Sequence, residues 1–194
     1  MTTLTPTTEL EAINTLLSTI GEAPVSTLVG VQAADVLLAQ AVLKEVSRKI
    51  QTMGWHFNTE TGFPLTPDEF NHIRLPENTA EVDPDTEYHF KEEYDLIRRG
   101  DRLYDRRNHT YEFQTTIYVN ITFLLPFDEL PESVKHYIII KAARIFADRA
   151  VGAENMHTYT LRDEQEAWSA MLHAEGETAD YNILDDALKH WRRR

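Results

Sequence analysis

Apolar residues recur every three or four positions near the start of the chain, and this spacing predicts a first helix. Thr8 and Glu11 form a capping-box pattern before it, because each side chain can accept a hydrogen bond from the other residue's backbone amide. Gly21 and Pro24 predict where the helix ends. Its apolar face consists of Leu10, Ile13, Leu16, Leu17 and Ile20.

A longer helical pattern follows and ends at Gly54. Its apolar residues alternate at steps of three and four, which is the spacing of a stripe that packs against another helix. That helix belongs either to this chain or to a neighbouring copy. The stripe consists of Val36, Ala39, Leu43, Val46, Ile50 and Met53.

The helical spacing disappears from Trp55 to Leu125, and six of the eight prolines lie in or beside this segment. A turn at Gly100–Asp101 between two strand-like runs predicts a hairpin. The acidic stretch Glu77–Glu87, with Pro84 between two aspartates, predicts an exposed loop. Strands are expected at 63–65, 73–75, 95–98, 102–105 and, with the clearest alternation of apolar and polar residues, at 116–125.

Helical spacing returns towards the end of the chain. Pro131 stands at a favoured first helical position, and Glu132 suits the positive end of the helix dipole. The helix at 134–151 is apolar over most of its circumference, which indicates a central position, and Gly152 predicts its end. A further helix is expected at 160–175, with Leu161, Trp168, Met171 and Leu172 on one side.

These patterns together predict an α+β fold. Residues 1–54 and 126–194 are expected to form a helical bundle from both ends of the chain, and residues 55–125 a β-rich region with a hairpin. A chain of 194 residues can bury about 70% of its unfolded surface, so its core needs neither a disulfide nor a metal.

The composition excludes several kinds of chemistry and location. The chain has no cysteine, which removes disulfides, thiolate zinc sites and cysteine nucleophiles. Its first residues lack the basic and apolar segments of a signal peptide, and no apolar run is long enough to cross a bilayer. We therefore expect a soluble protein without a membrane partner, made in a reducing cytoplasm.

The charge is negative overall but unevenly distributed. The formal net charge of −13 argues against general nucleic-acid binding. Eight carboxylates lie between Glu77 and Asp95, whereas five arginines lie between Arg98 and Arg107. Adjacent patches of opposite sign are usually solvated faces, but neighbouring copies of one subunit also use them to bind each other.

The hairpin arginines are the candidate contact residues of the middle segment. We assign Arg98, Arg102 and Arg106 to contacts with neighbouring subunits or partners. A nucleic-acid-binding module is another interpretation, since Tyr104 lies among the arginines and could stack on a base. Alternating aspartates and arginines on a hairpin are more typical of a subunit contact.

No catalytic, cofactor or metal motif stands out. None of the eight histidines belongs to an HExxH pattern, and the chain has no GxSxG, P-loop or GxGxxG. His89 and Glu93 share helical spacing, but surface positions account for all eight histidines. Sequence neighbours such as Asp163 and Glu164 point in different directions, so they make no acid–base pair. We expect no catalytic, cofactor-binding or metal-binding residue.

Short sequence fragments follow one another along nearly the whole chain in the order of a known family. They are Gly21–Leu28, Ile50–Gln51, Gly54–Asn58, Leu103–Asp105, Leu130–Glu132, Ala142–Arg144 with Phe146 and Arg149, Gly152–Ala153, and Asp180–Leu184. In this order they resemble the tail tubular protein A family of short-tailed bacteriophages, the podovirus class.

The resemblance implies a structural virion protein. Members of this family are adaptors, or head–tail connectors, of which twelve copies form a ring between the portal protein and the tail nozzle protein. The implied ring lines the channel for DNA ejection, and the DNA passes without specific binding. The implied location is the virion tail, after synthesis in the cytoplasm of the infected bacterium. An acidic lumen suits such a channel, because it does not hold phosphates.

Two alternatives stay open at this point. The first is a glycan-acting hydrolase, a polysaccharide depolymerase working with carboxylates, alone or as a second function of the adaptor. The second concerns the C-terminal segment from Asp180, whose residue pattern predicts a short helix. This helix docks either on the bundle of its own chain or, as the resemblance favours, on the portal. The contact residues assigned there are Tyr181, Leu184, Trp191, Arg192, Arg193 and Arg194.

Overall fold

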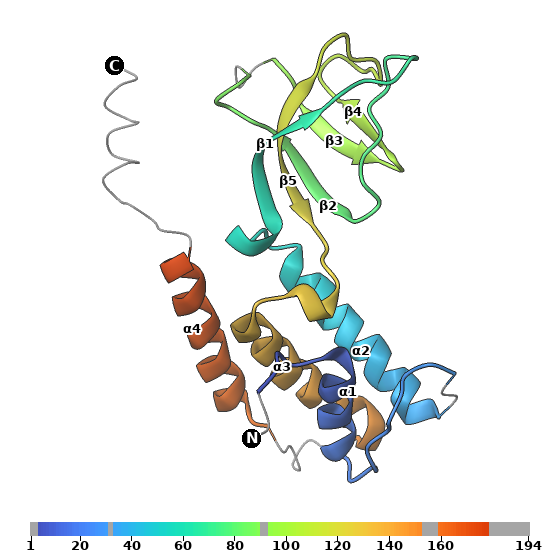
Figure 1. Ribbon diagram of the computed structural model, residues 1–194, viewed down its shortest axis with the longest axis vertical. Coiled ribbons are helices and arrows are strands. Elements are labelled where there is room, and N and C mark those ends of the chain that lie inside the picture. Colours follow the sequence, from blue (N-terminus) through green and yellow to red (C-terminus); the bar gives the residue numbers. More distant parts are fainter. Residues whose placement is uncertain (1–3, 31–32, 90–92, 153–158, 179–194) are drawn as a thin grey trace.

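The computed structural model describes residues 4–30, 33–89, 93–152 and 159–178, with helices at both ends of the chain and strands between them (Figure 1). The helices lie at one end of an elongated molecule and the strands at the other. This confirms the predicted α+β fold class. The elements are α1 (Glu9–Ser18), α2 (Ala34–Gln51), the short 3-10 helix η1 (His56–Asn58), β1 (Thr59–Leu65), β2 (Thr79–Pro84), β3 (Leu96–Arg99), β4 (Arg102–Asp105), β5 (Ile117–Phe123), the 3-10 helix η2 (Phe127–Glu129), α3 (Glu132–Val151) and α4 (Leu161–Thr178).

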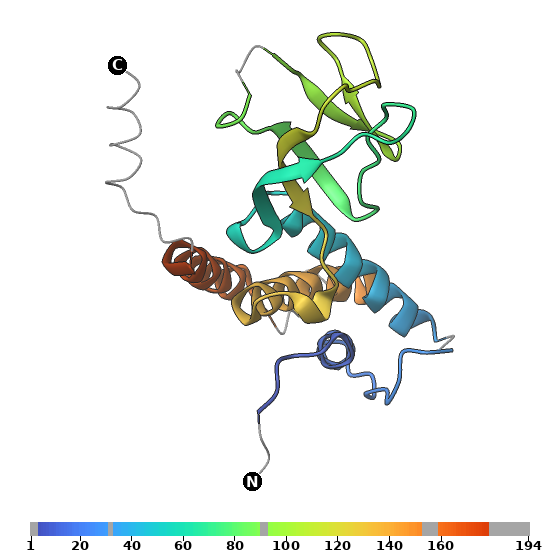
Figure 2. The same cartoon turned by 45° about the horizontal axis from the view of Figure 1, so that its top comes forward.

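Helix α3 is the centre of the helical part, because α1, α2 and α4 all pack against it (Figure 2). Val134, Ile138, Ala142 and Phe146 have no exposed surface. A helix covered on three sides needs apolar residues around most of its circumference, which explains the predicted pattern. Gly152 ends α3 in the left-handed conformation, at φ +65°, as predicted.

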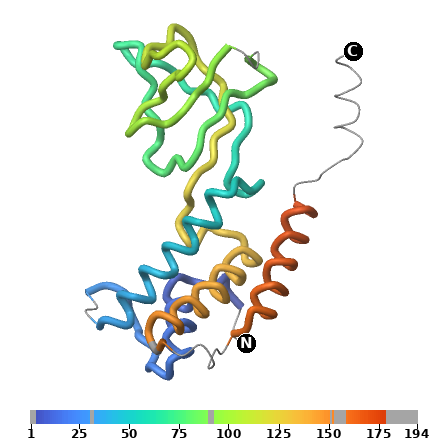
Figure 3. The backbone as a smooth tube through the Cα atoms, turned by 180° about the vertical axis from the view of Figure 1, so that it is seen from behind, coloured from blue at the N-terminus to red at the C-terminus, as the bar shows by residue number. Residues whose placement is uncertain are grey.

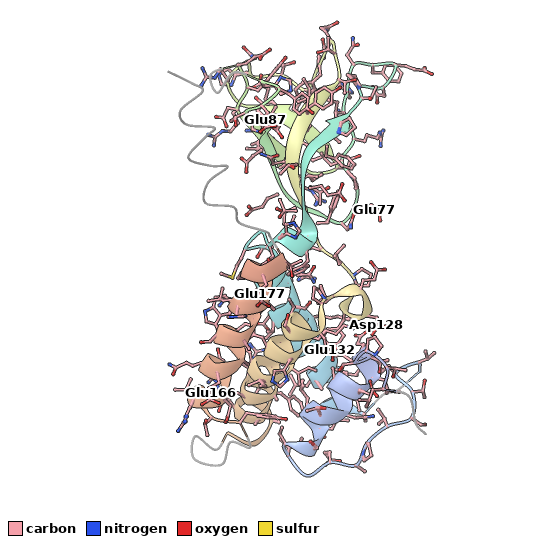
Figure 4. The ribbon with its side chains drawn as sticks, turned by 60° about the vertical axis from the view of Figure 1, so that its left-hand side comes forward. Glu77, Glu87, Asp128, Glu132, Glu166 and Glu177 are labelled. Carbon is pink, nitrogen blue, oxygen red and sulfur yellow. The ribbon has the colours of Figure 1, made fainter. Side chains whose placement is uncertain are left out.

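The start of α1 has the predicted capping box. The Thr8 hydroxyl accepts a hydrogen bond from the Glu11 amide at 3.3 Å, and the Glu11 carboxylate accepts one from the Thr8 amide at 2.8 Å. The neighbouring Glu9 amide donates to the Asp128 carboxylate at 2.8 Å, and Thr7 donates to Glu132. The N-terminal segment is thereby bound to η2 and the start of α3, where Figure 4 labels Asp128 and Glu132.

Two details of the predicted helices are wrong at their ends. Helix α2 ends at Gln51, so Met53 lies beyond it and is 56% exposed. Pro131 precedes the first turn of α3, because its ψ of 147° is extended, and the helix begins at Glu132. On α4, Ala167 and Met171 are buried against α3, whereas Leu161 and Leu172 lie to one side of this contact and are 63% and 42% exposed.

The β-rich part contains a three-stranded antiparallel sheet, in the order β1-β5-β2, and the predicted hairpin β3-β4. Strand β5 is central, and its residues Ile117, Val119 and Ile121 are buried as the alternation predicted. Phe123 is only partly buried, at the end of the strand. The core of this part, separate from that of the helices, consists of Leu65, Ile73, Leu75, Val82, Leu96, Leu103, Phe113, Ile117, Val119 and Ile121.

The acidic segment expected to be a loop contains strand β2 instead. Val82 supplies the apolar position facing the core, while Glu81 and Asp83 point to solvent on an edge strand. One buried valine among carboxylates gives little periodicity, so the sequence pattern hid this strand. The strand expected at 73–75 forms only an isolated bridge between Arg74 and Arg102, although Ile73 and Leu75 are buried.

Substitution of Leu43 by Asp tests the placement of α2. Leu43 is 1% exposed, so the charge would enter the helical core, and we expect a loss of about 3–5 kcal/mol in the free energy of unfolding. Leu37→Asp is the matched control, because Leu37 lies on the same helix and is 46% exposed. Chemical denaturation of both variants gives the comparison. Equal, small effects of the two substitutions would contradict the placement.

Candidate assembly interfaces

The helical part and the β-rich part are joined by a neck, where the chain crosses once from α2 to β1 and once from β5 to α3. The side-chain amide of Gln51, at the end of α2, binds the backbone of the second crossing. Its oxygen accepts from the Leu125 amide at 2.7 Å, and its nitrogen donates to the Leu125 carbonyl at 3.1 Å and to the Ser47 hydroxyl at 3.0 Å. Gln51 is 2% exposed, and every polar atom of its amide has a partner.

A second buried amide, Asn58, completes the neck. Its nitrogen donates to the Gln51 carbonyl at 2.9 Å and to the Phe123 carbonyl at 2.7 Å, and its oxygen accepts from the Trp55 amide at 2.9 Å. Asn58 is 3% exposed. The two crossings do not pair as strands at the neck, so hydrogen bonds from these two side-chain amides connect them instead. The fragments Ile50–Gln51 and Gly54–Asn58 of the family resemblance contain both of them.

Trp55 connects the neck to α4. Its indole N–H donates to the Ile50 carbonyl at 2.7 Å, and its ring meets Trp168 edge-on with 5.5 Å between centroids. The Trp168 ring also lies 4.9 Å from that of Tyr137 on α3. Near the end of α4, the Glu175 carboxylate accepts from the His56 amide at 2.9 Å. The C-terminal end of α4 is thereby held at the neck.

One carboxylate clamps α4 onto α3. Glu164 accepts hydrogen bonds from Lys141 at 2.7 Å and from Arg144 Nε at 2.9 Å, and Arg144 Nη2 forms an ion pair with it at 2.8 Å. The three side chains are mostly buried. Burial by itself raises the pKa of Glu164, but the hydrogen bonds from the two cations outweigh it and hold this pKa below the ordinary 4.5. Burial likewise lowers the pKa of Lys141, but its hydrogen bonds to Glu164 and Tyr137 hold it above the ordinary 10.5.

The three arginines assigned to partner contacts lie on or beside the β3-β4 hairpin, and each has an intramolecular partner. Arg98 donates to the Thr79 and Gly100 carbonyls, the second at 2.9 Å. Arg106 donates to Asp95 at 2.8 and 2.9 Å and stays 57% exposed. Their assignment to subunit contacts stays a prediction.

Aromatic rings on the hairpin side contact two further arginines, Arg99 and Arg102. The Arg102 guanidinium lies 4.7 Å from the centroid of the Tyr111 ring, and the Arg99 guanidinium lies 3.8 Å from that of Tyr104. Tyr104 is 8% exposed, so its ring is a support for Arg99 and not a free stacking surface. The predicted contacts at Tyr181, Leu184, Trp191 and Arg192–Arg194 lie outside the described residues.

The polar candidates weighed from the sequence have structural roles. His89 is not a surface histidine, since its side chain is 11% exposed and its Nε2 accepts from the Tyr118 amide at 3.0 Å. The carboxylate of Glu93 lies 3.7 Å from the other ring nitrogen. Asp163 caps α4 by accepting from the Thr160 amide at 2.7 Å. Among the described residues, no group of three or more His, Cys, Asp or Glu side chains could hold a metal ion.

The hydrogen bond that His89 accepts from Tyr118 also explains how two prolines fit into the sheet. Strand β2 ends at Pro84, and beyond it the His89 imidazole, in place of a strand carbonyl, accepts the hydrogen bond from the Tyr118 amide. The Tyr118 carbonyl accepts from the Asp85 amide at 3.0 Å. Because both backbone groups of Tyr118 face the β2 side, Pro64 can lie opposite it in β1 without a hydrogen bond. The 85–89 loop is thereby bound to the central strand.

Glu164→Gln tests the clamp between α3 and α4. The substitution keeps the shape but removes the carboxylate shared by two mostly buried cations, and Arg144 keeps only its longer contact of 3.9 Å with Asp148. We therefore expect a loss of about 1–3 kcal/mol in the free energy of unfolding at pH 7. The lowered pKa of Glu164 means that its stabilisation is present above pH 4.5 and is lost as the pH falls through the lowered value. The raised pKa of Lys141 preserves the pair up to at least pH 10.5.

Denaturation curves of the two proteins from pH 3 to 10 therefore converge only at the acidic end. Glu166→Gln is the control, since its pair with Arg162 on the same helix is exposed, and solvent screening leaves such a pair little effect on stability. A difference between Glu164→Gln and the wild type that persists unchanged at pH 3 would contradict the electrostatic origin of the clamp.

Comparison with known protein families agrees with this architecture. The family model described as tail tubular protein matches residues 10–181, which include every strand and all but the first residue of the helices. No curated protein matches the chain. None of the described helices is both long and apolar enough to cross a membrane. Because the match covers far more than half of the 194 residues, the chain belongs to the tail tubular protein family and is a structural protein of a phage tail.

Proposed function

We propose that this chain is the adaptor subunit of a short-tailed phage, and that twelve copies form a ring between the portal protein and the tail nozzle protein. The observation that supports this most strongly is the two-ended subunit, with helices at one end, strands at the other and a hydrogen-bonded neck between them. A connector needs two binding surfaces held at a fixed separation. The neck provides this separation in a chain of the tail tubular family.

The ring encloses the channel through which DNA leaves the head, and the DNA passes without specific binding. The net charge of −13 supports this role, because phosphates are not retained by an acidic lumen. The protein acts in the virion tail after synthesis in the cytoplasm of the infected bacterium.

Two sets of residues make the partner contacts. The hairpin residues Arg98, Arg102 and Arg106 bind neighbouring subunits or the nozzle, because the hairpin lies at the end of the molecule far from the bundle (Figure 1). The C-terminal residues bind the portal, with Trp191 as an aromatic anchor and Arg192–Arg194 paired with carboxylates of the portal. Tyr181 and Leu184 supply the apolar part of this contact.

Electron microscopy of the purified chain mixed with its portal protein tests the proposal. We expect one ring of twelve copies on the portal. A chain lacking residues 183–194 should melt at the same temperature as the full chain and fail to bind the portal. A full chain that binds neither portal nor nozzle protein contradicts the adaptor function, and a truncated chain that binds portal normally contradicts the assignment of the tail.

A second variant in the same experiment tests the contact made by the hairpin. Changing Arg98, Arg102 and Arg106 together to Glu should impair ring or nozzle assembly while circular dichroism shows a folded monomer. Some loss of stability is expected, because the exposed pair of Arg106 with Asp95 contributes about 0–1 kcal/mol. The hydrogen bonds from Arg98 to the Thr79 and Gly100 carbonyls are lost as well. Normal assembly combined with loss of salt-dependent DNA binding would instead assign the arginines to nucleic acid.

A further inference from the structure

Helix α2 presents an exposed stripe that none of the described residues covers. Leu37, Ala41, Lys44 and Arg48 follow one another at steps of four, three and four, on the side opposite the buried face. All four are exposed, and Leu37 is 46% exposed. Beside the second half of the stripe, the surface has a hollow of about 250 Å³ between α2 and the crossing at 124–127. The stripe has an apolar start, Leu37 and Ala41, followed by the two cations Lys44 and Arg48.

Helix α4 presents a stripe with the same spacing. Leu161, Gln165, Trp168 and Leu172 also follow at steps of four, three and four. Leu161 and Leu172 are 63% and 42% exposed, although both are large and apolar. A hollow of about 230 Å³ opens along this stripe, and Tyr137, Leu161, Glu164, Gln165 and Trp168 line it.

The two stripes belong to opposite flanks of the helical part. Helix α3 lies between α2 and α4 and packs against both, as the views from the front and from behind agree (Figures 1 and 3). Both helices start at the end far from the strands and run towards the neck. Gln51 and Glu175 fix their C-terminal ends there. A rotation about the long direction of the molecule therefore brings α4 of one copy beside α2 of the next, in parallel.

The charges of the two helices are complementary. Helix α4 carries five carboxylates and one arginine, a net charge of −4 with His173 neutral, and Figure 4 labels Glu166 and Glu177 towards its two ends. Helix α2 carries three cations and two carboxylates, a net charge of +1, with Lys44 and Arg48 on the exposed stripe. Opposite net charges favour a contact between these flanks over a contact of α4 with α4.

We propose that the exposed stripe of α4 in one copy packs in parallel against the exposed stripe of α2 in the next. Leu37 enters the hollow beside Leu161 of its neighbour, and the Lys44 ammonium lies over the Trp168 ring. Arg48 meets the acidic C-terminal end of α4. The contact joins two different surfaces of one chain, and such a contact forms a ring when its rotation closes. The inference rests on the proposed adaptor ring and names the surface that builds it.

Disulfide trapping tests the contact and its direction, because the chain has no cysteine of its own. Single variants Leu37→Cys, Arg48→Cys, Leu161→Cys and Leu172→Cys are mixed in pairs, assembled with portal and oxidised. We expect disulfide-linked dimers from the pairs 37 with 161 and 48 with 172. The pairs 37 with 172 and 48 with 161 are matched controls, since their Cβ atoms would be about 16 Å apart in a parallel arrangement, too far for a disulfide.

The outcomes separate this inference from the adaptor function. Rings on the portal that yield no dimer from 37 with 161 would overturn the inference and leave the adaptor function intact. Dimers from the control pairs instead would show an antiparallel contact and also overturn it. A chain that forms no ring with portal contradicts both proposals.

A variant without cysteines gives an independent readout. Leu161→Asp lies on an exposed site, so its melting temperature should equal that of the wild type, while its self-association weakens by about tenfold or more. Ala170→Asp is the control, because Ala170 is exposed on α4 and lies on the side of the helix opposite the stripe. Equal self-association of the Leu161→Asp variant and the wild type would also overturn the inference.

Discussion

Two buried side-chain amides at the neck determine how the rest of this molecule is arranged. Gln51 and Asn58 bind backbone groups of the two crossings between the helices and the strands, where no helix or sheet could satisfy them. A buried amide left unpaired at either position would lower the free energy of unfolding by about 1–3 kcal/mol. Separating the two crossings while both amides stay buried is therefore unfavourable. The helical core and the β-rich core are otherwise separate clusters.

The neck also connects to the surfaces that we assign to assembly. Trp55 and His56, between the two amides, contact Trp168 and Glu175 of α4. Glu164 then holds the same helix on α3 through Lys141 and Arg144. The exposed stripe of α4 is therefore positioned by contacts that begin at the neck.

Periodicity predicted the helices well, because each buries one continuous face. The capping box at Thr8, the buried stripe from Val36 to Ile50 and the end of α3 at Gly152 were all predicted from residue types alone. Strand β2 was missed because edge strands in water need few apolar residues, and only Val82 marks its inner face. A strand was predicted at 73–75, but this segment pairs with Arg102 at one bridge only, although Ile73 and Leu75 are buried.

The residues of the neck could not be assigned from periodicity. In the sequence, Gln51 is a single polar residue at the end of a helix, and its partner Leu125 lies 74 residues further along the chain. The family resemblance contained Ile50–Gln51 and Gly54–Asn58 but gave them no role. Likewise, Glu164 was one carboxylate among many until the structure placed it between two cations of α3. Interactions between distant segments depend on the fold, which local patterns do not encode.

The central claim is that the amide of Gln51 holds the two ends of the subunit in one orientation. Residual dipolar couplings measure this directly, because they report how each part is aligned in solution. We predict that one alignment tensor fits the couplings of both parts in the wild type, and that two tensors are needed after Gln51→Leu, which removes the bonds to Leu125. A wild-type protein that already requires two tensors, or a Gln51→Leu variant that still needs only one, would contradict the account.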